Sequence, residues 1–266
     1  MKIAETVLDF CTGDWGEDRL YAGRELVCVI DGATPISKQP FEAYHSSAEW
    51  MAEGLRRYVA SECGFDGDFP ALCRRFVDAT CGSIRGQFPD LYDLPCLTVA
   101  ALWQNGKRLS GYVLGDCSIY ALMKNGDVRR VTDQRTAVFY NKTLEAREKA
   151  RRTGQDVQRA VREQRIRNKA AMNRPDGYWT VAYTGDFERM FRTFSADAEQ
   201  VDAVLLCTDG FDRLFSLNEI RPGGVLKRQI SLKEALSLLR RAEDARENGG
   251  HIKKHDDAAA ILLIGE

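Results

Sequence analysis

The residues of this chain that could do chemistry are aspartates at the ends of short apolar runs. The aspartates are Asp31, Asp116, Asp209 and Asp256, and the runs beside them are residues 26–30, 112–115, 203–208 and 258–264. Continuous apolar runs of this length are typical of strands that are buried on both faces. We therefore predict that the four acids lie at strand ends, where they can converge on one point.

Such a group of acids would suit a pair of divalent cations. Carboxylate oxygens and a backbone carbonyl are hard ligands, suited to Mg²⁺ or Mn²⁺ rather than to zinc or copper. Two such ions about 4 Å apart can hold a bridging water, lower its pKa and neutralise a phosphate under attack. Asp31, Asp209 and Asp256 would supply carboxylates, and Gly32 leaves the backbone open to a ligand. One aspartate alone is more often a turn or cap residue, but the recurrence favours a site.

The histidines do not offer a competing site. His45, His251 and His255 are not in metal-ligand spacing with a cysteine or with another histidine. The sequence also lacks the Gly-x-Ser-x-Gly and Gly-x-x-x-x-Gly-Lys patterns of esterases and nucleotide-binding loops. We interpret the three histidines as surface residues.

The composition is that of an ordinary soluble globular protein. Of the 266 residues, 44% are hydrophobic and 29% are charged, with a net charge of −1. The sequence has neither an apolar run near the roughly 18 residues of a membrane span nor a signal-peptide pattern at its start. None of the eight cysteines forms a Cys-x-x-Cys pair, which favours reduced thiols. We predict a cytoplasmic protein that does not bind membranes.

The expected elements mix helices and antiparallel strands. A strand is expected over 4–10, and capping boxes predict helices from Ser46 to about 61 and from Ser231 to near Gly249. An apolar stripe predicts a further helix over about 69–86. Two Asn-Gly dipeptides predict an antiparallel meander of the strands 96–103, 109–114, 118–123 and 128–132. We therefore favour α+β layers over a doubly wound parallel sheet.

The segment 142–174 is strongly basic. It holds eleven Lys and Arg residues and four Asp and Glu residues, a local charge of +7. We expect surface helices here, either as a solvated face or as a guide for an anionic substrate. Because no aromatic residue lies between Tyr140 and Tyr178 to stack on a base, a nucleic-acid site is disfavoured.

The order of motifs resembles that of the type 2C metal-dependent protein phosphatases, in particular a bacterial branch of the family. The family carries an acidic pair, a strand ending in Asp-Gly, a Gly-Asp-Ser turn, a strand ending in Ser/Thr-Asp-Gly and a final Asp-Asn. In this chain the corresponding stretches are Gly16-Glu17-Asp18, Val29-Ile30-Asp31-Gly32, Leu114-Gly115-Asp116-Cys117, Cys207-Thr208-Asp209-Gly210 and His255-Asp256-Asp257. Each motif is weak, but five in the same order are fairly specific.

The resemblance implies a fold and a set of roles. The fold would be an αββα four-layer sandwich, with residues 1–266 as one domain and a basic helical flap at about 135–178. A dinuclear Mn or Mg site would lie at one edge, with a possible third ion. By position, Asp31 would bridge both ions, the Gly32 carbonyl would bind one, and Asp209 and Asp256 would complete the first ion's ligands; Asp18 or Glu17 would serve the second ion, and Asp116 the third.

The chain also departs from the family pattern at three positions. The arginine that binds phosphate in many members lies four residues before the acidic pair, where this chain has Gly13. Arg19, Arg24 or a flap arginine could replace it. Ala33 stands where some members have a histidine proposed as general acid, and Asp257 replaces the usual asparagine. Whether Asp256 or Asp257 is the ligand stays open.

The leading hypothesis is hydrolysis of phosphoserine and phosphothreonine in proteins by a metal-activated water, with Asp31 and Asp209 as the catalytic residues. One alternative is a non-catalytic binding module that keeps the sandwich as a scaffold for protein partners. Another is a phosphatase that acts on a small phosphorylated metabolite. The sequence leaves open the physiological substrate, the cognate kinase, the choice between Mn and Mg, and the oligomeric state.

Overall fold

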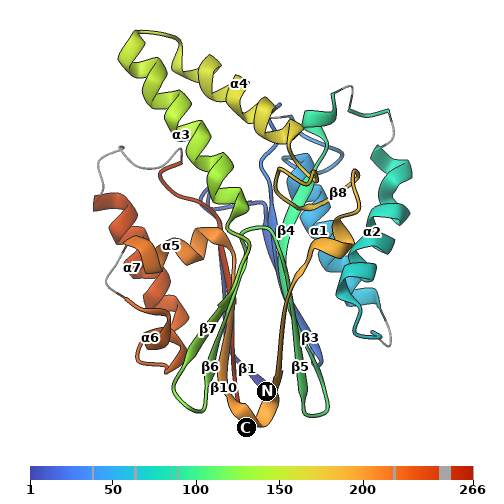
Figure 1. Cartoon of the computed structure of the whole chain (residues 1–266), viewed down its shortest axis with the longest axis vertical. Helices are drawn as coiled ribbons and strands as arrows, with labels where there is room; N and C mark the ends of the chain where they lie inside the picture. Colours follow the sequence, from blue (N-terminus) through green and yellow to red (C-terminus); the bar gives the residue numbers. More distant parts are fainter. Residues whose placement is uncertain are drawn as a thin grey trace.

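The fold is built on two antiparallel sheets, which the computed structural model shows packed face to face between helices (Figure 1). The model describes residues 1–37, 39–62, 65–84, 86–88, 90–217, 220–245 and 253–265. The predicted end of a helix near Gly249 and the predicted surface position of His251 lie outside these ranges.

In the described residues, the first sheet has the strand order β2-β3-β4-β5-β9, with the short β8 paired to β4. Its strands are β2 (Asp18–Ala22), β3 (Leu26–Gly32), β4 (Cys96–Asn105), β5 (Arg108–Leu114), β8 (Val181–Ala182) and β9 (Arg192–Asp197). The second sheet has the order β1-β11-β10-β6-β7. Its strands are β1 (Lys2–Asp9), β6 (Ser118–Met123), β7 (Val128–Val131), β10 (Val201–Cys207) and β11 (Ala258–Ile264).

Helices cover the outer face of each sheet, so the predicted αββα sandwich is confirmed (Figure 1). Helices α1 (Ser47–Ser61) and α2 (Phe69–Ile84) pack on the first sheet. Helices α5 (Asp209–Leu217), α6 (Pro222–Leu226) and α7 (Leu232–Ala245) pack on the second. Both predicted N-caps are present, since the Ser46 hydroxyl accepts from the Glu49 N–H at 3.0 Å and the Ser231 hydroxyl from the Glu234 N–H at 3.2 Å.

Strand β3 shows why its apolar run is continuous. Successive side chains of a strand point to opposite faces. Val27 and Val29 pack between the two sheets, whereas Cys28 and Ile30 pack under α1 and α2. Because both faces are covered, every position of the run must be apolar until the strand ends. The same alternation places Asp31 on the inter-sheet side, at the end of the buried run.

The prediction of one continuous meander is wrong. β4 and β5 form a hairpin in the first sheet, and β6 and β7 form one in the second. Residues 115–117 cross from one sheet to the other, and Gly115 allows this with a φ of +83°. The Asn-Gly turns were correct signals for each hairpin, but they carry no information on which sheet a hairpin joins. Asp116 therefore lies in the crossover between the sheets.

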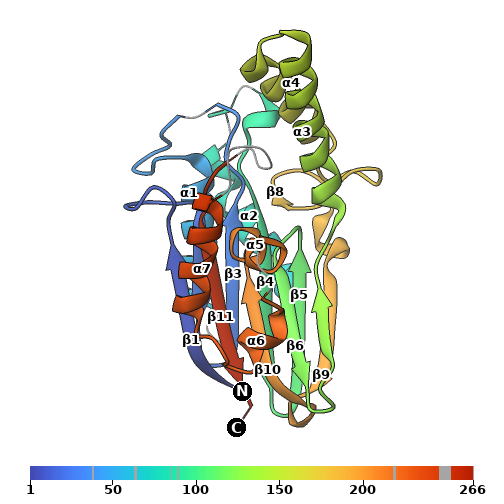
Figure 2. The ribbon, with the colours of Figure 1, turned by 90° about the vertical axis from the view of Figure 1, so that its left-hand side faces the viewer.

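The basic segment forms the predicted helices, α3 (Arg135–Thr153) and α4 (Val157–Ala170). Gly154 ends α3 in the left-handed conformation, with a φ of +68°, and α4 returns beside α3. The pair projects beyond one end of the sandwich, as Figure 2 shows. We call residues 135–178 the flap. Its helix α4, which is described along its whole length, has no fully buried residue.

Candidate active site

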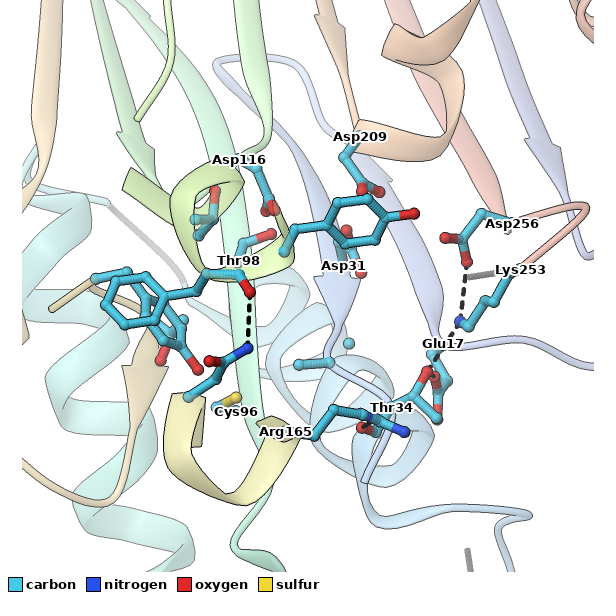
Figure 3. A pocket seen from close by; sticks show the side chains of 18 of the residues that line it. Glu17, Asp31, Thr34, Cys96, Thr98, Asp116, Arg165, Asp209, Lys253 and Asp256 are labelled. Atoms are coloured by element: carbon cyan, nitrogen blue, oxygen red, sulfur yellow. Dashed lines mark hydrogen bonds and ion pairs between the residues drawn. The ribbon is translucent and has the colours of Figure 1, made fainter. Parts of the chain in front are cut away.

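Every site residue predicted from the sequence lines one cavity of about 420 Å³ between the ends of the sheets and the flap (Figure 3). They lie at the ends of elements or in the connections between them. Together they are Asp18 at the start of β2, Asp31 and Gly32 at the end of β3, Asp116 in the crossover, Asp209 at the start of α5 and Asp256 before β11. Glu17 and Asp257 line the same cavity.

Pairing of β2 with β3 brings the first two acids together. Asp18 lies directly opposite Asp31 in the antiparallel register. The hydroxyl of Thr208, the residue before Asp209, donates to Asp18 Oδ2 at 2.7 Å. Since Thr208 follows β10 of the other sheet, this bond ties the acidic ends of the two sheets to each other.

Burial and mutual repulsion raise the pKa values of these acids. Burial is the largest cause of the raised pKa of Asp31, followed by the negative charge of Asp18. Burial, with Asp116 and Asp256 close by, raises the pKa of Asp209 to about 7. No Lys or Arg among the described residues forms an ion pair with Asp18, Asp31 or Asp209. The cluster therefore favours the binding of cations.

The donor set fits Mg²⁺ or Mn²⁺ in chemistry, because it consists of carboxylates and carbonyl oxygens. Within the described ranges, no three Asp, Glu, His or Cys side chains are close enough to hold an ion by themselves. This agrees with the habit of Mg²⁺, which takes one or two carboxylates and keeps several waters. The site therefore fits ions that are held by few side chains each.

Gly32 has a packing role that the sequence did not indicate. A Cβ at this position would lie 2.9 Å from the Glu17 carbonyl oxygen and 3.0 Å from that of Ala48. The Gly32 N–H donates to the Glu17 carbonyl at 3.1 Å. Glycine is thus needed here so that the acidic loop before β2 can approach the end of β3.

The structure separates the tasks of Asp256 and Asp257. Asp257 accepts from the backbone N–H groups of Cys11 at 2.9 Å and Glu17 at 2.6 Å, one with each carboxylate oxygen. It therefore fastens the loop that carries Glu17. Asp256 instead contacts the side chains of Arg213 and, at 3.0 Å, Lys253. Its carboxylate attracts cations and is the better candidate for a ligand.

The basic residues of the cavity were largely missed from the sequence. Arg19, one of the named candidates, is held by Glu49 and Glu53 at 3.1 Å each and is not among the described residues that line the cavity. Arg165 of α4 does line it, which agrees with the expectation that a flap arginine could serve. Lys253 and Arg213 had no signal in the sequence beyond their nearness to Asp256 and Asp209.

Of the positions that depart from the family pattern, Ala33 lines the cavity, whereas Gly13 is not among the described residues that line it. Gly13 lies in an exposed turn, and nothing is within 4 Å of the place where its Cβ would be.

His45 is exposed and stacks on Trp15, with ring centroids 4.5 Å apart, as expected for a surface histidine. His255 is partly buried instead, and its ring contacts Glu243 and Asp244.

Comparison with known families settles the relationship. The family model of protein phosphatase 2C matches residues 13–245. The chain belongs to the protein phosphatase 2C family. The matched residues contain Asp18, Asp31, Asp116 and Asp209, whereas Asp256 lies beyond them, directly before β11, and lines the same cavity. No curated protein matches the chain by sequence.

Solved structures of bacterial phosphatases share the fold. The serine/threonine phosphatase PstP/Ppp of Mycobacterium tuberculosis is 19% identical with a TM-score of 0.56, covering 98% of this chain and 97% of that chain. The catalytic domain of PstP in complex with two manganese ions is 18% identical with a TM-score of 0.55, at the same coverage. Stp1 of Staphylococcus aureus is 14% identical with a TM-score of 0.58, covering 100% and 98%. In the described part of this chain, no helix is long and apolar enough to cross a membrane.

Proposed function

We propose that the protein is a metal-dependent phosphatase that hydrolyses phosphoserine and phosphothreonine in proteins. The observation that carries the proposal is the convergence of Asp18, Asp31, Asp116, Asp209 and Asp256 on one cavity without basic partners for most of them. Membership of the protein phosphatase 2C family supports a phosphatase. Manganese in the related PstP structure supports the choice of metal.

The free thiols of the described cysteines favour a reducing compartment, so we propose the cytoplasm as the location.

In this proposal the acids would have the roles that the family pattern implies. Asp31, Asp209 and Asp256 would hold the first ion, Asp31 and Asp18 would serve the second, the Gly32 carbonyl would bind one of them, and Asp116 would hold a weaker third ion. When bound, the ions supply a water of lowered pKa and positive charge beside the phosphate. Asp18 is preferred to Glu17, because both carboxylate oxygens of Glu17 already accept hydroxyls, from Ser46 at 2.7 Å and from Thr34.

Other residues of the chain position the acids. Asp257 holds the loop of Glu17 and Asp18 through two backbone N–H groups, and Thr208 fixes one oxygen of Asp18. Gly32 allows that loop to lie against the end of β3. These contacts leave the acids oriented before any substrate binds, which lowers the reorganisation that the reaction needs.

The test is hydrolysis of p-nitrophenyl phosphate and of a phosphothreonine peptide, each with and without Mn²⁺. Asp31→Asn and Asp209→Asn should reduce turnover to background and keep the unfolding temperature of the metal-free protein at least as high as in the wild type. Asp127→Asn, in an exposed turn at the other end of the sandwich, is the matched control and should keep wild-type turnover. Unchanged turnover in either site variant would contradict the proposal.

Because position 13 holds a glycine instead of the arginine of many family members, we retain a second candidate function, a non-catalytic binding module. Folded protein that binds Mn²⁺ and hydrolyses no phosphoester would support that module. Faster turnover of small phosphorylated metabolites than of phosphopeptides would instead move the same chemistry to a metabolite substrate.

A further inference from the structure

We propose that Arg165, on helix α4 of the flap, binds the phosphate group of the substrate in place of a residue at position 13. The inference rests on the proposed function and adds a substrate-binding residue to it. It also makes the flap a part of the active site rather than a neighbour of it.

The cations that line the cavity differ in their partners. Arg213 contacts Asp256 and Glu243, and Lys253 contacts Asp256, so both are neutralised by carboxylates. Lys169 donates to the Cys96 sulfur at 2.9 Å and to the Leu94 carbonyl at 3.4 Å. Arg165 is half-buried, and no Asp or Glu among the described residues forms an ion pair with it.

The position of Arg165 favours an anion between it and the acids. Its side chain runs from α4 toward Thr34 and the Glu17 side of the cavity (Figure 3). One N–H group, on Nη2, donates to the Thr34 carbonyl at 2.8 Å. Burial lowers the pKa of Arg165, while the charge of Glu17 opposes that change. The guanidinium thus lines the cavity on its Thr34 and Glu17 side, and only one of its N–H groups has a hydrogen bond to a described residue.

A phosphate monoester matches these donors. A guanidinium offers five N–H donors in a planar fork that suits two phosphate oxygens at once. A half-buried cation without a carboxylate partner is unfavourable until an anion reaches it. The dianionic phosphate would lie between Arg165 and the cations held by the aspartates, so that positive charge faces it from both sides.

The contact with Thr34 fixes the direction in which Arg165 points. The Thr34 carbonyl accepts from Arg165, and the Thr34 hydroxyl accepts from Lys253 at 3.0 Å and donates to Glu17. Thr34 follows the Asp31-Gly32 turn by two residues. The arginine is therefore held against the segment that directly follows β3, the strand that carries Asp31, although it comes from a distant helix.

The proposal also divides the charge of the flap into two parts. Arg165 and Lys169 are four residues apart, so they share one face of α4 and both line the cavity. Arg162 and Arg167 are exposed. Both interpretations of the basic segment then hold, one for each face: the exposed arginines form a solvated surface, and the cavity face takes the anion.

The experiment compares Arg165→Gln and Arg165→Lys with Arg167→Gln as the matched control. Arg167 is an exposed arginine of the same helix, and it contacts Gln164. Binding of inorganic phosphate to the Mn²⁺-loaded protein is measured by calorimetry. KM and kcat are measured for p-nitrophenyl phosphate and for a phosphothreonine peptide, and unfolding temperatures are compared to detect a merely structural role.

Arg165→Gln should weaken phosphate binding about 10- to 100-fold, the usual effect of losing hydrogen bonds to a charged group. KM should rise by a similar factor for both substrates, because both contain the phosphate. Arg165→Lys should recover part of the affinity, since it keeps the charge but not the fork. The unfolding temperature of Arg165→Gln should match that of Arg167→Gln.

Phosphate affinity in Arg165→Gln equal to that of the control would overturn the inference. A loss seen with the phosphopeptide alone would assign Arg165 to peptide binding, and that outcome would overturn it too, as would a wild-type protein that binds no phosphate. If the wild-type protein hydrolyses its substrates and Arg165→Gln binds phosphate as tightly as the wild type does, this inference alone is contradicted. If the wild-type protein shows no turnover but binds phosphate, and Arg165→Gln loses that binding, the inference is supported and the proposed function is contradicted.

Discussion

The two ends of the sandwich use the same residue type for different physical reasons. At one end, Gly106 and Gly126 lie in hairpin turns with positive φ, and a Cβ on either would meet nothing within 4 Å. At the acidic end, a Cβ would come within 3.0 Å of another atom at each of Gly32, Gly115 and Gly210. The two hairpin glycines therefore serve backbone conformation alone, whereas these three glycines of the acidic end allow close approach of elements, and Gly115 also has a positive φ of +83°.

The carboxylates of the two ends differ in the same way. Asp127, in the hairpin turn that contains Gly126, is exposed and bonded to the neighbouring Asn125 side chain at 2.7 Å. The acids of the other end are crowded by tight backbone contacts and raise one another's pKa. Dense packing thus holds together charges that would otherwise separate, and the metal-free protein has stability to regain when cations bind.

The largest effect is expected for Gly210→Ala. Its Cβ would lie 1.8 Å from the Asp257 carbonyl oxygen, so the backbone that carries Asp256 must move. We expect the free energy of unfolding to fall by about 3 kcal/mol, as for severe overpacking, and turnover to fall as well. Urea denaturation measures the first effect.

Gly82→Ala is the matched control for Gly210→Ala, because it adds the same methyl group to a helical glycine with nothing within 4 Å. It should raise the free energy of unfolding by up to about 1 kcal/mol, the helix propensity gain of alanine. Equal losses in the two variants would show that the crowding at Gly210 is unimportant.

The second effect is the pH dependence of the metal-free protein. Asp209 has a pKa raised to about 7 by burial and neighbouring acids, against about 4 in the unfolded chain. A raised pKa gives stability that is full below about pH 4 and is lost as the pH rises through about 7. In EDTA we expect a loss of about 2 kcal/mol between pH 5 and 8, measured by urea unfolding.

Asp209→Asn should flatten this slope, and Mn²⁺ should restore stability at pH 8 in the wild type. Asp127→Asn removes an exposed carboxylate from the hairpin end and should keep the wild-type slope. A wild-type protein that gains stability with pH across this range would contradict the interpretation of the acidic end.

A smaller effect is expected for Lys253→Met. Lys253 contacts Asp256 at 3.0 Å through a partly exposed side chain, so its ammonium competes with a metal ion for that carboxylate. Mn²⁺ should bind the variant about threefold to fivefold more tightly at pH 7, in line with the strength of an exposed ion pair. Calorimetry measures the dissociation constant. Lys254→Met, which removes a contact with Asp244 instead, should leave it unchanged.

The smallest effect is expected for Gly106→Asn at the hairpin end. Its φ of +57° is one that asparagine tolerates, and the space beside it is open. The free energy of unfolding should change by less than about 0.5 kcal/mol in urea. Gly115→Asn, where a Cβ would lie 2.3 Å from the Thr98 side chain, should cost several times more. Similar costs at both sites would remove the distinction between the two ends.

The elements that were predicted correctly are those that local physics determines. The apolar run before Asp31 could be read as a buried strand, and the serines at 46 and 231 could be read as caps, because each signal lies within a few residues. The acids could be located at strand ends for the same reason. Their family order then indicated that they meet, and the cavity agrees.

The features that were predicted wrongly or left open depend on distant residues. The split of the meander into two sheets is decided by which faces are buried, and turn sequences do not contain that information. The reach of Arg165 to Thr34 depends on the register of α4 against a loop 131 residues away. The division of work between Asp256 and Asp257 depends on the backbone of Cys11 and Glu17, far away in the sequence.

The pairing of β1 with β11 has a consequence for fusing other domains to the chain and for moving its termini. Lys2 lies opposite Ile264, and both chain ends emerge at the hairpin end, away from the flap (Figure 1). A partner domain tethered at either end would therefore stay clear of the cavity. A short linker could also join the ends, with new termini opened at the exposed turn around Gly154, and such a circular permutant should still gather the same aspartates.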